Sequence, residues 1–120
     1  MRAQIKKFHS PDILDLENFV PKDPERFAFL LQVFIGPEGQ DGQESFDIEV
    51  CTPKWLIQNY TDDTVIIGRH YLIVFKYDFK RITETIKAFC KNCTGETWAE
   101  VAIKLSRLGM WEFEDYREKE

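Results

Sequence analysis

The sequence predicts an α+β domain in which a single, mostly antiparallel sheet is packed by about three helices, one of them short. Two strand-like runs, residues 27–35 and 45–51, are joined by an acidic loop that contains three glycines. Two later segments, residues 79–93 and 98–108, carry apolar side chains at the spacing of one helical stripe. Strands joined as a hairpin and followed by amphipathic helices are typical of this fold class.

The N-terminal half predicts a strand, an acidic loop and a second strand. Residues 3–9 alternate around Ile5 and predict the first strand. Residues 10–26 hold three prolines, which break regular structure, and more acids than bases. Residues 27–35 are apolar at nearly every position, as expected for a strand that is covered on both faces.

Residues 45–51 alternate in character and predict a half-buried strand. Phe46, Ile48 and Val50 fall on one face. The other face takes the polar set, Ser45, Asp47, Glu49 and Cys51. The preceding loop, residues 36–44, is too long for a tight two-residue turn. The sheet core and the most acidic surface are therefore predicted to lie within one hairpin.

A short helix over residues 53–60 follows, with Thr52 as its N-cap and Pro53 in its first position. Gly68 interrupts the next apolar stretch and predicts a bulge or bend. Residues 71–77 are β-branched and aromatic nearly throughout, which predicts a central strand.

The C-terminal third predicts two helices and a last short strand. Asp78 caps the first helix, whose outer side is basic, and Thr94 is the expected cap of the second, which ends at Gly109. Residues 110–114 alternate and predict a strand. We expect one domain over residues 1–120, with 112–120 forming a frayed end. The apolar stripe of the first helix comprises Phe79, Ile82, Ile86, Phe89 and Cys93, and that of the second comprises Trp98, Val101, Ala102, Leu105 and Leu108.

Composition excludes several classes of function. The chain has 21 acidic and 16 basic residues and a net charge of −5, which argues against general binding to nucleic acid. No apolar run approaches the roughly 20 residues of a membrane span. The N-terminus lacks the apolar region of a signal peptide, and three cysteines fit a reducing compartment. We therefore expect a cytoplasmic protein.

The residues with potential chemistry do not form a recognisable active site. Cys90 and Cys93 make a C-x-x-C pair, but zinc needs two further ligands, and a redox pair sits at a helix N-terminus. We interpret both as packed structural cysteines. Arg69 and His70 have no nucleophile motif beside them. The sequence therefore predicts no catalytic residue, no cofactor and no metal site.

Acidic residues are the remaining candidates. Asp47 and Glu49 lie two apart on one strand face, which fits a solvated surface and a docking surface for a basic partner about equally. The candidate interface residues are Glu38, Asp41, Glu44, Asp47 and Glu49 of the hairpin, and Asp12, Asp15 and Glu17 of the preceding loop. An alternative is a metal-binding or hydrolytic site formed by Asp47, Glu49 and His70.

Three stretches carry a resemblance to a known family. They are FAFLLQVFIGPEGQDGQESFDIEVCTPKWL, GRHYLIVFKYD and TWAEVAIKLSRLGMWEFEDY. Together they resemble the immunity protein 8 family of bacterial polymorphic toxin systems, with CTPKWL the most distinctive segment. The resemblance implies an α+β fold, no catalysis and a protein partner, namely a cognate toxin encoded beside the immunity gene.

The resulting hypothesis is a cytoplasmic immunity protein that binds and neutralises one toxin domain. If the toxin is a nuclease, its basic substrate cleft would suit the acidic candidates. A homo-oligomeric adaptor that uses an exposed strand edge is a third possibility, although nothing in the sequence indicates an oligomer.

Overall fold

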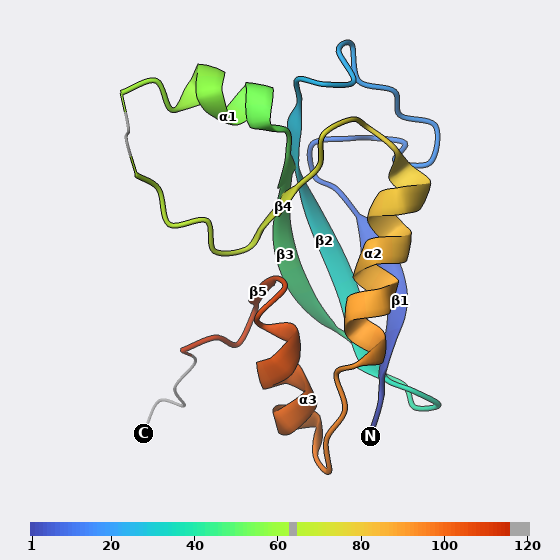
Figure 1. Ribbon diagram of the computed structural model, residues 1–120. Helices are drawn as coiled ribbons and strands as arrows, with labels where there is room; N and C mark the ends of the chain where they lie inside the picture. Colours follow the sequence, from blue (N-terminus) through green and yellow to red (C-terminus); the bar gives the residue numbers. More distant parts are fainter. Residues whose placement is uncertain (63–64, 116–120) are drawn as a thin grey trace.

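The computed structural model describes residues 1–62 and 65–115 and has the predicted α+β fold (Figure 1). The described residues form a five-stranded sheet and three helices, so the predicted fold class is confirmed. In chain order the elements are β1 (Ala3–His9), β2 (Ala28–Pro37), β3 (Glu44–Cys51), α1 (Pro53–Asn59), β4 (Tyr71–Ile73), α2 (Phe79–Lys91), α3 (Trp98–Leu105) and β5 (Met110–Trp111).

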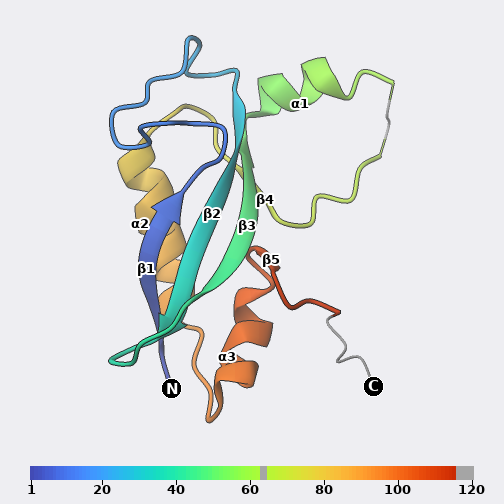
Figure 2. The same ribbon diagram turned by 180° about the vertical axis from the view of Figure 1, so that it is seen from behind.

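The sheet is mixed, with the order β1-β2-β3-β4 and with β5 also paired to β3. β1, β2 and β3 are antiparallel neighbours, β5 is antiparallel to β3, and β4 is parallel to β3. Helices α2 and α3 pack on one face of the sheet, which we call the covered face (Figure 1). The view from behind shows β1, β2 and β3 with no helix in front of them (Figure 2). We call this side the open face.

Strand β2 differs from the prediction that both of its faces are covered. Phe29, Leu31, Val33 and Ile35 are buried on the covered face. Their neighbours Leu30, Gln32 and Phe34 point to the open face and are only half-buried. The prediction was wrong because both large helices lie on the same side, and an antiparallel sheet tolerates one solvated face.

Strand β3 has the predicted alternation. Phe46, Ile48 and Val50 are buried without exposed surface on the covered face. Asp47 and Glu49 lie on the open face, opposite Gln32 and Leu30 of β2.

Strand β4 is the largest departure from expectation. The sequence predicted a central strand over residues 71–77, but β4 spans Tyr71–Ile73 only and pairs with β3 at the edge of the sheet. After the bond from the Val74 N–H to the Cys51 carbonyl, at 2.9 Å, the chain leaves the sheet. The Tyr77 N–H then donates to the Pro24 carbonyl, at 2.7 Å. Gly68 makes a turn with Tyr71 and not a bulge.

Two helix starts follow the sequence rules. The Thr52 hydroxyl accepts from the Trp55 N–H at 3.3 Å, with Pro53 in the first turn of α1. The Asp78 carboxylate accepts from the Arg81 N–H at 3.2 Å and caps α2. Both predicted caps are therefore confirmed.

The helical stripes agree with the sequence except at two points. In α2, Cys90 is buried, in line with Ile82 and Ile86, whereas Phe89 is 37% exposed. Thr94, the predicted cap, instead forms an isolated antiparallel β-bridge with Arg2. Thr97 caps α3, and its hydroxyl accepts from the Glu100 N–H at 3.3 Å. The buried position in α2 is one residue later than predicted, and the cap of α3 is three residues later. The burial of Val101, Ala102 and Leu105 is as predicted.

The C-terminal end of the described chain is a short strand followed by a turn. β5 holds only Met110 and Trp111, because the Glu114 N–H donates back to the Trp111 carbonyl at 2.9 Å. Gly109 precedes it where a Cβ atom would lie 3.0 Å from Phe46, so close packing favours glycine there. Of the end expected to fray, residues 112–115 form a turn, and 116–120 lie outside the described residues, so that expectation stays a prediction.

Candidate functional site

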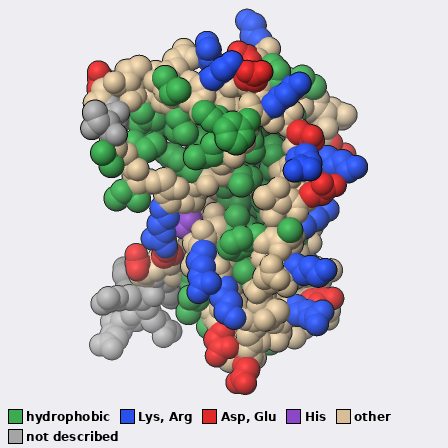
Figure 3. All heavy atoms as spheres, in the orientation of Figure 1, with side chains coloured by type: hydrophobic (Ala, Val, Ile, Leu, Met, Phe, Trp, Pro, Cys, Tyr) green, Lys and Arg blue, Asp and Glu red, His purple; other side chains and the backbone are tan. Residues whose placement is uncertain are grey.

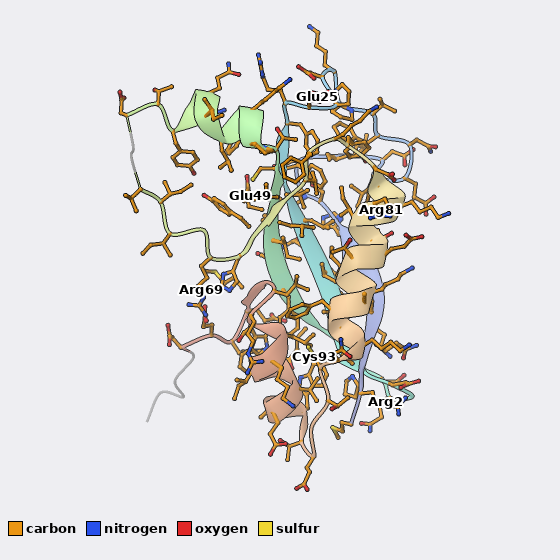
Figure 4. All side chains as sticks on the ribbon, viewed as in Figure 1. Arg2, Glu25, Glu49, Arg69, Arg81 and Cys93 are labelled. Atoms are coloured by element: carbon orange, nitrogen blue, oxygen red, sulfur yellow. The ribbon has the colours of Figure 1, made fainter. Side chains whose placement is uncertain are left out.

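Asp47 and Glu49 share the open face of β3, and Asp12, from a separate acidic segment, lies near Glu49. Asp47 and Glu49 lie on β3, and Asp12 follows the end of β1. An Asp12 carboxylate oxygen accepts from the Leu30 N–H of β2 at 2.8 Å, and Leu30 is the partner of Glu49. Figure 4 labels Glu49 beside the edge of β3. We call Asp12, Asp47 and Glu49 the acidic patch.

The electrostatics of the acidic patch support this proximity. Burial, and next the charge of Asp12, raise the pKa of the Glu49 carboxyl above its ordinary value. Asp47 has one buried carboxylate oxygen, Oδ1, that finds no hydrogen-bond partner among the described residues. Both observations mean that the folded chain holds these charges at some energetic cost. Such a cost is relieved when a cation of another molecule binds there.

Aromatic side chains border the acidic patch on the β4 side. The hydroxyls of Tyr60 and Tyr71 lie 2.9 Å apart, and the Trp55 ring meets the Tyr60 ring edge-on. The Tyr60 hydrogen bond is the main cause that raises the pKa of Tyr71 to about 12. Burial, followed by the Glu49 charge, raises the pKa of the Cys51 thiol to about 11. Neutral pH therefore leaves these groups protonated, and the carboxylates supply the charge.

The Tyr60–Tyr71 pair was not predicted from the sequence. The two residues lie on separate elements, and no local periodicity relates them. Only the parallel pairing of β4 with β3 places Tyr71 beside Glu49.

Glu44 lies on the covered face and not with the acidic patch. Its two carboxylate oxygens accept hydrogen bonds from the indole N–H groups of Trp98 in α3 and Trp111 in β5, the latter at 2.9 Å. It also pairs with Ile35 of β2. Glu44 therefore connects α3 and β5 to the hairpin. Its position two residues before Phe46, which puts both on one face of the strand, could have indicated this role.

The other acidic candidates are dispersed. Glu38 and Asp41 lie in the hairpin loop, at the far end of β3 from Glu49. The five residue steps from Glu44 to Glu49 span roughly 17 Å. Asp15 is engaged by the Asn18 side chain at 2.8 Å, and Glu17 is exposed. The predicted interface residues thus divide into the acidic patch, Glu44 on the covered face and isolated surface acids.

The structure separates the groups of the alternative metal or hydrolytic site. The Nε2 atom of His70 lies 2.8 Å from the Ser106 carbonyl at the end of α3, on the covered side of the sheet. Asp47 and Glu49 face the other side. Within residues 1–62 and 65–115, no group of three or more His, Cys, Asp or Glu side chains is placed to hold a metal ion. The expected constellation is not assembled.

The C-x-x-C pair behaves as packed side chains. Cys90 and Cys93 are both buried free thiols. Burial is the main cause that raises the pKa of Cys90 to about 12, and it also raises that of Cys93. A thiol with a raised pKa is a poor nucleophile and a poor redox centre.

A family model described as Immunity protein 8 matches residues 3–116. The chain belongs to the immunity protein 8 family. The match runs from β1 to the end of the described chain and includes every residue of the acidic patch. No curated protein and no solved structure matches the chain. An immunity protein family implies a protein partner and is consistent with neutralising a toxin.

The immunity protein 8 match carries no assignment of individual residues, so the acidic patch stands on its geometry alone. Among the described residues, no helix is long and apolar enough to cross a membrane; α2, with 13 residues, falls well short of the roughly 20 needed.

Proposed function

We propose that this protein binds and neutralises a toxin domain, and that it does so by non-covalent docking without a catalytic step of its own. The immunity protein 8 match over residues 3–116 is the observation that carries the proposal. The acidic patch supports it, because its carboxylates lie at a sheet face on which no helix packs among the described residues (Figure 2). Free thiols at Cys51, Cys90 and Cys93 favour the cytoplasm as the place of action.

The acidic patch suits a toxin with a basic contact surface, such as the substrate cleft of a nuclease. Complementary charge speeds the association of two proteins and helps select the partner, and salt weakens this electrostatic attraction. A lysine or arginine of the toxin would pair with the partly exposed carboxylates of Asp47 and Glu49 through charge-assisted hydrogen bonds.

The test is binding to the toxin domain encoded beside this gene. Co-expression should restore growth of cells that make the toxin, and the two proteins should co-purify. Neutralising the patch with Asp47→Asn and Glu49→Gln should slow association at low salt by about tenfold or more and flatten its salt dependence.

Glu84→Gln with Glu96→Gln is the matched control, because both are exposed acids outside the acidic patch and the pair makes the same change in net charge. Association rates of the patch variant that equal those of the control would remove the acidic patch from the interface. Absence of any complex with the unaltered protein would contradict the proposed function itself.

A further inference from the structure

A groove runs along the covered side, between the chain that leaves β4 and the first turns of α2. Its walls are residues 72–78 on one side and Arg81, Ile82 and Thr85 on the other, around a cavity of about 590 Å³. Figure 3 shows hydrophobic side chains gathered over α1, β4 and this segment, with basic side chains at the margins.

The apolar wall of the groove is unusually exposed. Ile73 is 49% and Phe75 is 79% exposed, although both lie in a stretch whose composition is that of a central strand. Single exposed apolar residues are common on protein surfaces, but two that line one groove beside a larger apolar area are typical of a protein contact. Aromatic residues in particular act as anchors at such contacts.

Basic side chains outnumber acidic ones among the residues that line the groove. Lys76 and Arg81 line it, and the acid among its lining residues, Asp78, is engaged in capping α2 through the Arg81 N–H. The outer side of α2 continues this basic character with exposed Lys80, Lys87 and Lys91. Figure 4 labels Arg81 on α2 and Glu49 beside β3. The groove therefore has the opposite charge to the acidic patch.

We propose that the groove binds a segment of the toxin partner that presents an apolar side chain flanked by carboxylates. This inference rests on the proposed function and adds a second contact to it. β4 adjoins both sites, because Tyr71 pairs with Glu49 while Leu72 and Ile73 line the groove. One toxin domain that straddles β4 contacts both, and the two opposite charges fix its orientation.

Charge decides against a second copy of this chain as the occupant. A two-fold contact built on the groove brings Lys76 and Arg81 toward their own copies near the axis. Like charges placed together in this way oppose association. An acidic segment of another protein meets no such repulsion.

The experiment compares groove variants with matched controls in binding to the adjacent toxin domain. Phe75→Ser should weaken binding by about tenfold or more, mainly through faster dissociation, because an anchor in a pocket is lost. Ile103→Ser is its control, since Ile103 is 58% exposed on α3 and belongs neither to the groove nor to the acidic patch. This control should leave binding within about twofold of the unaltered protein.

A charge-reversed pair tests the basic margin. Lys76→Glu with Arg81→Glu should slow association more than Lys87→Glu with Lys91→Glu, which makes the same change in net charge further along α2. Hydrogen exchange of the complex should show protection of the backbone over residues 72–85.

The outcomes separate this inference from the proposed function. If the unaltered protein binds the toxin and the groove variants bind equally well, the proposed role of the groove is contradicted, while the proposed function is not. If the unaltered protein does not bind, the function fails and the toxin is not the occupant. A concentration-dependent dimer that Phe75→Ser dissolves would make a second copy the occupant and overturn the inference.

Discussion

The two faces of the sheet use the same strands in opposite ways. On the covered face, Phe46, Ile48 and Val50 of β3 are fully buried beneath α2 and α3. On the open face, the alternate residues Asp47 and Glu49 keep partial exposure and carry charge. The comparison shows how one eight-residue strand supplies both the core and the candidate binding surface.

The difference between the faces follows from where the helices pack. Because side chains on the covered face pack closely beneath α2 and α3, the stability of the fold depends on their shape and volume. The open face tolerates polar residues, so its side chains are available for recognition. Each of the following predictions measures one aspect of this contrast.

The largest effect is expected from the same substitution made on both faces. Phe46→Ala removes a fully buried ring that stacks on Trp111 and should cost about 3–5 kcal/mol in the free energy of unfolding. Phe34→Ala, at a half-buried open-face position, should cost only about 1 kcal/mol. Urea denaturation measures both. Equal losses would mean that something covers the open face of the protein in solution.

An intermediate effect is expected from Glu44, the acidic candidate that belongs to the covered face. Glu44→Ala leaves two indole N–H groups without their acceptor and should cost about 1–3 kcal/mol. Asp41→Ala in the exposed loop should change stability by less than about 0.5 kcal/mol. Tryptophan fluorescence follows both unfolding curves. A Glu44 variant as stable as the loop control would show that the indoles need no carboxylate.

The smallest effect is expected at Glu49 and depends on pH. Because its pKa is raised in the folded state, the folded chain binds this proton more tightly, and stability falls as pH rises above the ordinary value of 4.5. Glu49→Gln should therefore raise Tm at pH 7 by roughly 1–3 °C, and the gain should vanish at pH 4. Thermal melts at both pH values, with Glu84→Gln as control, test this. A loss of stability at pH 7 would mean that ionised Glu49 is stabilised by an interaction in the folded chain.

Local features of the fold were predictable from local sequence. The caps Thr52 and Asp78 and the alternation of β3 depend on neighbouring residues, and all three are confirmed. The prediction for residues 71–77 failed because strand propensity does not determine how many residues of a segment pair with a neighbouring strand. β4 pairs along three residues only, and Phe75 remains exposed beyond it.

The sequence alone determined the face on which the alternating residues of β3 lie. Alternation of period two placed Asp47 and Glu49 on one face and Phe46 on the other, because this parity is local. Tertiary structure decided which charges meet. Asp12 reaches Leu30 beside Glu49, Glu44 joins two tryptophans, and Lys76 faces a groove against α2. These contacts join distant segments, and packing of the helices on one face selects them over the many other pairings that the same local pattern allows.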